Sequence, residues 1–436
     1  MLHTLEKLKS GELLGLKRVN ISCGLTEFPK EIYTLSESLE ILDLSNNQLS
    51  ALPNDLVLLK NLKTIFLGNN KFTEFPKILA KLPVLSMIGF KSNQIANIPE
   101  NAFPPLLRWL ILTNNNLQKL PKSIGTCKYL QKFLVAGNLI EELPNEMANC
   151  KNLELLRISS NKLKTIPDWL FQLPKLSWVA FGGNPATHKI KIENEIASYD
   201  WNDFNIHQVL GQGASGVISK AHWLSKNKAV AIKVFKGAVT SDGLPEDEMK
   251  ASIAAEQHLN LIPILGKIKN HPERKHGLLM EFISPDFINL GNPPSLVSCT
   301  RDVFDEKTSL AINDVVKIAT NMASVAAHLH NKGINHGDLY AHNILINKAS
   351  KILFGDFGAA TFYDTNSKLA KHIERVEVRA FGCLLEDVLA LVDESEIETP
   401  LYIHLQKIKQ RCFAVEVKNR PSFSEITKEL SNIKNS

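Results

Sequence analysis

Several features that would restrict function are missing from this sequence. No apolar run approaches the ~20 residues that a helix needs to cross a bilayer, and the amino-terminal stretch lacks the apolar segment of a secretory signal. The six cysteines lie far apart and form no C-x-x-C pair, so we interpret them as reduced and mostly buried thiols. No block of lysine and arginine stands out, which disfavours nucleic-acid or membrane binding. We therefore expect an intracellular, cytoplasmic protein.

The composition is that of an ordinary folded protein. A chain of 436 residues with 44% hydrophobic and 22% charged residues can form two or three domains, and each half can bury its own core. The net charge of +5 is small for this length.

The first half of the chain repeats one motif. Asparagines recur at intervals of 22 or 23 residues, each in the frame L-x-x-L-x-L-x-x-N-x-L, as in "LEILDLSNNQL". The alternating leucines predict a short strand with inward-facing side chains, and the asparagine can bond backbone groups where the chain leaves the strand. A following "LP" pair ends the strand and begins the return segment. The asparagines are Asn47, Asn70, Asn93, Asn115, Asn138, Asn161 and Asn184.

These repeats resemble the leucine-rich-repeat family over about residues 12–190. Stacking of the repeats predicts a parallel sheet, and the irregular first unit, with Cys23-Gly24 in place of asparagine, resembles a terminal cap. The concave positions of several strands are apolar, notably Met87, Trp109 and Trp178. Two interpretations remain open: a protein partner binds there, or the second half of the chain folds back and covers part of this surface.

After residue 185 the repeat stops and phosphate-binding features begin. The sequence "FNIHQVLGQGASGVISKAHW" predicts a strand, a glycine-rich turn and a second strand, in which Gly211, Gly213 and Gly216 let the backbone approach phosphates. In the next strand, "VAIK" places Lys233 seventeen residues after the last glycine, where it can reach the phosphates of ATP.

Further motifs follow in a fixed order. Glu248 lies fifteen residues after the lysine in a helical pattern, with Glu246 and Glu256 as less favoured alternatives. The stretch "GLLMEFI" precedes "HGDLYAHN", which precedes "DFG". Together with "RAFGCLLEDVL" and "NRPSF", these motifs resemble the protein kinase family over roughly residues 200–430.

The kinase resemblance implies roles for individual residues. Lys233 and Glu248 would pair beside the nucleotide, and Asp338 would orient the acceptor hydroxyl as the catalytic base. Asn343 and Asp356 would bind Mg²⁺, a hard cation that prefers oxygen ligands. Contacts to ATP are implied for Gly211, Gln212, Gly213, Ala214, Ser215, Gly216, Ile218, Ala231, Lys233, Met280, Glu281, Ile283 and Leu345.

The catalytic loop departs from the kinase pattern. Gly337 replaces the arginine that usually meets an activation-loop phosphate, so we expect control without such phosphorylation. Tyr340 and His342 occupy positions where serine/threonine kinases have lysine and tyrosine kinases have arginine. A protonated His342 is one candidate for neutralising the transferred phosphoryl group.

The segment after "DFG" is also unusual. It contains no A-P-E triplet, and only nineteen residues separate Gly358 from Glu377, which stands where the family has an aspartate. Arg420 of "NRPSF" therefore lacks its usual glutamate partner unless Glu374 replaces it.

We predict an α/β leucine-rich-repeat solenoid (residues 1–190), a linker (191–200) and a two-lobed α+β protein-kinase-like domain (201–436). The resemblance is closest to bacterial leucine-rich-repeat kinases and implies transfer of the γ-phosphoryl of Mg-ATP to a serine or threonine hydroxyl, with the repeats recruiting a partner or substrate. We expect residues 200–436 alone to retain this chemistry. A non-catalytic ATP-binding scaffold and a small-molecule kinase are the alternatives.

Overall fold

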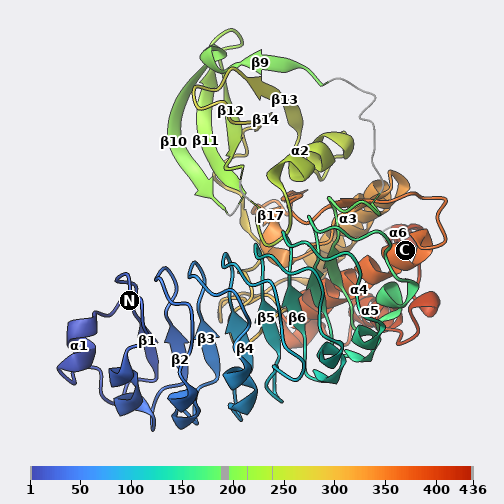
Figure 1. The fold of residues 1–436 in the computed structure, drawn as a ribbon. Coiled ribbons are helices and arrows are strands. Elements are labelled where there is room, and N and C mark those ends of the chain that lie inside the picture. Colours follow the sequence, from blue (N-terminus) through green and yellow to red (C-terminus); the bar gives the residue numbers. More distant parts are fainter. Residues whose placement is uncertain (1, 188–195, 214, 238, 434–436) are drawn as a thin grey trace. The chain divides into compact units, whose positions relative to one another are not determined.

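The computed structural model describes residues 2–187, 196–213, 215–237 and 239–433 (Figure 1). Contacts divide the chain into two compact units, one formed by Met1–Leu173 with Asn184–Ala186 and the other by Pro174–Gly183 with Thr187–Ser436. The predicted boundary at residue 190 differs from this division over Pro174–Gly183. Part of the predicted linker lies outside the described residues, and its last three residues, Ser198–Asp200, form strand β9.

The repeats form short parallel strands whose central side chains are buried, as the leucine pattern predicts. Leu42 and Ile65, for example, occupy equivalent places in successive strands and are fully buried. The strands follow one another in chain order, side by side in the blue-to-teal ribbon of Figure 1. They are β1 (Arg18–Asn20), β2 (Ile41–Asp43), β3 (Thr64–Phe66), β4 (Met87–Gly89), β5 (Trp109–Ile111), β6 (Lys132–Leu134), β7 (Leu155–Arg157) and β8 (Trp178–Ala180).

Buried asparagines connect neighbouring repeats. Asn115 accepts a hydrogen bond from the backbone N–H of Ile95 and donates to the carbonyls of Phe90 and Leu112. The same pattern of one accepted and two donated bonds recurs at Asn70, Asn93, Asn138 and Asn161. Each amide therefore satisfies backbone groups that would otherwise be buried without partners where the chain turns.

Each return segment contains one 3₁₀ turn, except in the irregular repeat after β4. All six turns begin directly after a proline: Pro29 and the prolines of the five "LP"-type pairs that were predicted to begin the return segments. A short helix, α1 (Leu5–Lys9), precedes the first strand. The turns are η1 (Lys30–Leu35), η2 (Asn54–Leu58), η3 (Lys77–Lys81), η4 (Lys122–Thr126), η5 (Asn145–Asn149) and η6 (Asp168–Gln172).

We predict that Asn115→Ala lowers the free energy of unfolding by about 3 kcal/mol, because it leaves buried donors and acceptors without partners. The matched control is Asn116→Ala, which removes an exposed amide next to it and is expected to change stability by less than about 0.5 kcal/mol. Urea unfolding of both variants measures the difference. Equal stabilities would show that the asparagines contribute nothing to the stacking of repeats.

The second unit begins with β8 and continues into a six-stranded sheet ordered β10-β11-β12-β14-β13-β9. This sheet and helix α2 (Pro245–Ala254) form the small lobe, drawn in green and yellow in Figure 1. A turn, η7 (Trp201–Asp203), connects β9 to the first long strand. The remaining strands are β10 (Phe204–Gln212), β11 (Gly216–Trp223), β12 (Lys228–Phe235), β13 (Ile264–Lys269) and β14 (Gly277–Glu281).

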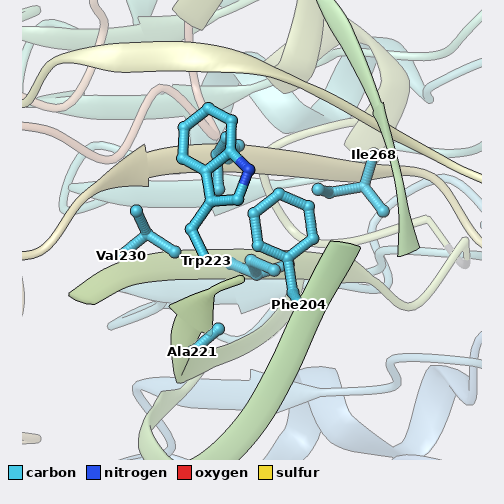
Figure 2. Close-up of a cluster of buried hydrophobic side chains, with 7 residues drawn as sticks. Phe204, Ala221, Trp223, Val230 and Ile268 are labelled. Carbon is cyan, nitrogen blue, oxygen red and sulfur yellow. The ribbon is translucent and has the colours of Figure 1, made fainter. Parts of the chain in front are cut away.

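Alternation along β12 determines which side chains enter the core. Val230 and Ile232 are fully buried in an apolar cluster that includes Trp223 and Phe204, as Figure 2 shows for its labelled members. Since successive side chains in a strand point to opposite faces, Lys233 is directed to the other face of the sheet, where α2 packs. The cluster therefore fixes the orientation of the candidate functional lysine.

Helices dominate the large lobe, which also contains a three-stranded and a two-stranded sheet of short strands. The helices are α3 (Ile312–Asn331), α4 (Ala370–Leu389), α5 (Pro400–Cys412) and α6 (Phe423–Ile433), with single turns η8 (Ala341–Asn343), η9 (Glu394–Glu396) and η10 (Val417–Asn419). The strands are β15 (Ile288–Asn289), β16 (Ile334–Asn335), β17 (Ile344–Ile346), β18 (Ile352–Phe354) and β19 (Thr361–Phe362). The predicted fold class is confirmed.

Two expectations from composition can be compared with this fold. All six cysteines are free thiols, and five of them are buried, as predicted. Among the described residues, no helix combines the length and hydropathy required to cross a membrane.

Candidate active site

The small lobe contributes a buried ion pair. Lys233 on β12 pairs with Glu248 on α2, and the two side chains are 11% and 3% exposed. Glu248, Ala251 and Ser252 are all buried, which places the glutamate on the inner face of the helix. Burial raises the pKa of Glu248, the Lys233 charge opposes this shift, and the nearby Asp356 carboxylate adds to it.

The two alternative glutamates have other partners. Glu246 lies 3.7 Å from His276 on an exposed surface. Glu256 forms an ion pair with Lys332 at 2.7 Å. Neither therefore competes with Glu248 for Lys233.

The glycine-rich turn joins β10 and β11 as predicted. The N–H of Gly213 donates to the Gly216 carbonyl at 3.0 Å, which closes the hairpin. A Cβ at Gly211 or Gly213 would meet nothing within 4 Å, whereas a Cβ at Gly216 would lie 2.6 Å from the Val234 carbonyl oxygen. The first two glycines thus border open space, and the third is required by strand packing. Of the other predicted turn residues, Gln212 ends β10, Ser215 lies in the turn, and Ala214 lies outside the described residues.

Several of the residues predicted to contact ATP lie on neighbouring strands. Ala231 pairs with Met280, and Ile218 pairs with Lys233, so these four residues lie in one region of the sheet. Of the remaining predicted residues, Glu281 ends β14, Ile283 is in the loop after it, and Leu345 is in β17.

Asp338 and Asn343 are held together in the catalytic loop. The Asn343 Nδ2 donates to Asp338 Oδ2 and to the Asp338 carbonyl, both at 2.9 Å. Since the amide nitrogen is committed to the aspartate, Asn343 Oδ1 is the atom left to face a cation. The two residues form one polar unit at the start of β17.

The DFG segment contacts the same loop through a buried histidine. Asp356 has φ +59° in the left-handed region, and its Oδ1 accepts a hydrogen bond from the Gly358 N–H at 3.3 Å. The His336 ring packs against Phe357 with centroids 5.0 Å apart, and its Nε2 lies 3.1 Å from the Gly355 carbonyl oxygen. Burial lowers the pKa of His336.

Comparisons with known proteins agree with this geometry. Residues 204–380 match the protein kinase domain model, and residues 37–95 and 128–185 match a leucine-rich-repeat model. The chain carries leucine-rich repeats followed by a protein kinase domain.

Curated relatives are distant and longer. A probable serine/threonine-protein kinase of Dictyostelium discoideum is 25% identical over 53% of this chain and 16% of its own length. One of Clostridium acetobutylicum is 25% identical over 54% of this chain and 40% of its own length. A serine/threonine-protein kinase of Arabidopsis thaliana is 28% identical over 43% of this chain and 38% of its own length. The chain thus spans less than half of each of these three relatives.

Glu377 on α4 supports the catalytic loop of the kinase domain. Its carboxylate accepts hydrogen bonds from the N–H groups of His336, at 3.1 Å, and Gly337, at 2.6 Å. Burial alone would raise the pKa of Glu377, but the nearby His330 and the Gly337 N–H outweigh burial and lower it. This residue was noticed in the sequence only as a replacement for aspartate, and the structure supplies its contacts.

Gly337 has a steric reason for replacing the family's arginine. Its φ is +72°, and a Cβ would lie 2.6 Å from the Val179 carbonyl oxygen and 2.8 Å from that of Ala359. Both atoms belong to backbone, so they cannot move aside like the end of a side chain. A side chain at this position is therefore excluded by the packing around the loop.

His342 is supported by a residue that the sequence analysis missed. Asp302 accepts a hydrogen bond from the His342 backbone N–H at 3.0 Å, and its Oδ1 lies 2.7 Å from His342 Nδ1. Burial lowers the pKa of His342, but Asp302 and the Asp338 and Asp356 charges raise it above its ordinary value. Asp302 lies forty residues earlier in a loop, and no motif there indicated it.

Arg420 is fully buried, but its partners are not the predicted ones. It donates to the carbonyls of Ala414, Arg375 and Pro174 at 2.7–3.0 Å. The hypothesis that Glu374 replaces the missing glutamate is wrong, since Glu374 accepts a hydrogen bond from the Phe423 N–H. Burial, with the charge of Arg379, lowers the pKa of Arg420 to about 10.

The prediction of a partner surface has mixed outcomes. Trp178 is 1% exposed and stacks on Tyr340, with ring centroids 4.4 Å apart and an interplanar angle of 7°. Its role as an open anchor for a partner is wrong, and the alternative that kinase residues cover it is confirmed. Met87 is also buried, so it offers no contact surface. Trp109 is half-buried with Lys132 Nζ 4.2 Å from its ring centroid, and it stays a candidate.

We predict that Glu377→Gln lowers the free energy of unfolding by about 2 kcal/mol at pH 7, because a neutral amide accepts backbone hydrogen bonds more weakly than a carboxylate. Because folding lowers the pKa of Glu377, its carboxylate stabilises the folded state at pH values above the unfolded pKa of 4.5. This stabilisation is lost as the pH falls through the lower pKa of the folded state. The difference between variant and wild type should therefore shrink at acidic pH.

Chemical unfolding at a series of pH values between 7 and 3 measures this difference. The exposed Glu398→Gln serves as control and should follow the wild type throughout. If the difference in free energy of unfolding between Glu377→Gln and the wild type stays constant with pH, the charge of Glu377 does not stabilise the loop.

Proposed function

We propose that this chain is a cytoplasmic protein kinase that transfers the γ-phosphoryl group of Mg-ATP to a serine or threonine hydroxyl. The observation that carries the proposal is a chain of neighbouring groups: Asp356 lies near the Lys233–Glu248 ion pair, and both Asp356 and the Asp338 of the Asp338–Asn343 unit lie near the His336 ring. The three serine/threonine-protein kinase relatives support the class of acceptor.

In the proposed reaction, the Lys233 ammonium binds the nucleotide phosphates and is oriented by Glu248. Asp338 accepts the hydrogen bond of the acceptor hydroxyl and takes its proton as the oxygen attacks the γ-phosphorus. The bond between that phosphorus and the bridging oxygen breaks, and ADP leaves. Tyr340 and His342 occupy the loop positions where other kinases have lysine or arginine. His342, which contacts Asp302, is therefore the candidate cation nearest to Asp338 in the sequence.

The residues fit the metal that this reaction requires. Asn343 presents Oδ1 because its nitrogen is bonded to Asp338, and Asp356 supplies a carboxylate, so both would offer the oxygen ligands that Mg²⁺ prefers. Bound Mg²⁺ would neutralise charge on the phosphates. The open space beside Gly211 and Gly213 leaves room for phosphate groups near the backbone.

The leucine-rich repeats are proposed to recruit a protein partner or substrate. The Trp109 side chain is half-buried at a concave strand position, and its indole nitrogen is among the buried atoms. The exposed part of a tryptophan ring is suited to anchoring a partner through apolar contact.

A small-molecule acceptor is the second candidate. The chain passes from β19 to α4 through only seven residues, 363–369, which leaves little segment to hold a peptide. Acceptor panels that include proteins and small hydroxyl compounds separate the two candidates.

We predict that Asp338→Asn lowers the turnover number by about 10²-fold or more while the affinity for Mg-ATP changes less than about threefold, since the residue serves the acceptor and not the nucleotide. Asp356→Asn should instead abolish Mg²⁺-dependent nucleotide binding. Transfer from γ-labelled ATP and nucleotide titration measure the two effects. Full activity in both variants would refute the proposed function.

We also predict that activity does not require a phosphate on the segment after DFG. Thr361 is buried and its Oγ1 accepts a hydrogen bond from the Phe181 N–H, while the buried Tyr363 hydroxyl lies 2.8 Å from His330 Nδ1. Neither hydroxyl is accessible to another kinase, and the loop arginine that would receive a phosphate is Gly337.

Initial rates before and after phosphatase treatment test this, with mass spectrometry to establish that Thr365 and Ser367 are bare. The rates should agree within about threefold. A tenfold loss would mean that a phosphate on the exposed Thr365 or the half-buried Ser367 orders the segment through another basic residue.

A further inference from the structure

The segment Pro174–Gly183 contains the last repeat strand, yet it belongs to the same compact unit as the kinase domain. It contacts that domain along its whole length. At its start, the Pro174 carbonyl accepts from Arg420, and the Ser177 hydroxyl accepts from Arg379 at 2.6 Å. At its end, the Phe181 N–H donates to Thr361 at 3.1 Å.

The centre of this segment contacts the catalytic loop. Trp178 Nε1 donates to the carbonyl of Leu339 at 3.0 Å, and its ring stacks on Tyr340. Asn335, at the other end of the loop, donates to the Val179 carbonyl at 3.0 Å. These contacts flank Asp338 on both sides in the sequence.

The stack continues beyond Tyr340. The rings of Tyr340 and His342 lie 4.9 Å apart, and His342 is fixed on its other side by Asp302. The loop from Leu339 to His342 is therefore held between the terminal repeat strand and Asp302. The positions of the two rings are those where other kinases have free basic side chains.

We propose that Trp178 is a positioning residue for catalysis: through Leu339 and Tyr340 it fixes the backbone on which Asp338 stands. The segment after DFG is too short to provide this support, and the terminal strand of the repeats provides it instead. This inference rests on the proposed kinase function, and it implies that residues 200–436 alone lack a part of the active site.

The test uses the full chain with three substitutions. Trp178→Leu removes both the stack and the donor while keeping an apolar side chain in a leucine-rich strand. Trp178→Phe keeps a ring for stacking and removes only the N–H. Trp169→Leu is the matched control, since Trp169 lies in turn η6 and its Nε1 donates to Asn145 within the repeats.

We expect Trp178→Leu to lower the turnover number at least tenfold while the Kd for Mg-ATP changes less than threefold, and Trp178→Phe to recover most of the rate. Trp169→Leu should match the wild type in both measurements. A purely structural role would instead lower the fraction of active molecules and leave the turnover number of those that bind nucleotide unchanged.

Amide hydrogen exchange of residues 335–342 is the second readout, and it needs no catalytic activity. Exchange there should be faster in Trp178→Leu than in the control, with Trp178→Phe between them. If the wild-type protein transfers no phosphoryl group, the proposed function is refuted. The exchange difference would still test whether Trp178 positions the loop. Wild-type exchange and turnover in a folded Trp178→Leu would overturn the inference. If that variant does not fold, exchange of residues 335–342 in Trp178→Phe as slow as in the Trp169→Leu control would overturn it instead.

Discussion

The arrangement of the candidate active site depends on one buried carboxylate. Glu377 accepts two backbone N–H groups from His336 and Gly337, immediately before Asp338 in the chain. A charged acceptor in a site that excludes water holds such donors strongly, and it would be costly to leave unpaired. The turn that it stabilises has a positive φ at Gly337, which allows the backbone of Val179 to approach. The last repeat strand can therefore pack against the catalytic loop only because Glu377 holds the turn and because Gly337 has no side chain.

The kinase domain combines ordinary nucleotide-binding features with an unusual large lobe. In the small lobe, the core cluster around Trp223 orients β12, and β12 delivers Lys233 to Glu248. In the large lobe, backbone carbonyls satisfy Arg420, and an aromatic stack occupies positions that are usually basic. The parts proposed to contact nucleotide thus keep the family pattern, while the parts proposed to lie near the acceptor depart from it.

The sequence predicted the periodic and local features well. The spacing of leucine, asparagine and proline predicted the strands, the bonds from asparagine to backbone groups and the start of each return segment, because each arises within one repeat or between adjacent repeats. Motif order likewise predicted the pairing of Lys233 with Glu248. Contacts between distant segments were not predictable: no pattern in the sequence indicated that Asp302 supports His342, or that Arg420 bonds the carbonyl of Pro174. Trp178 was identified as unusual, but whether a partner or the second half of the chain covers it stayed open, since its burial depends on residues more than 150 positions later.

The contact between Trp178 and the catalytic loop has a consequence for how this protein can evolve. Repeats before Pro174 resemble one another and have the same length within one residue, so duplication or loss of a whole repeat keeps the register of the array. The final repeat is different because its backbone carbonyls and its tryptophan are matched to particular residues of the kinase domain. Recombination that exchanges repeats is therefore tolerated only upstream of this unit, and the last repeat and the kinase domain must be inherited together.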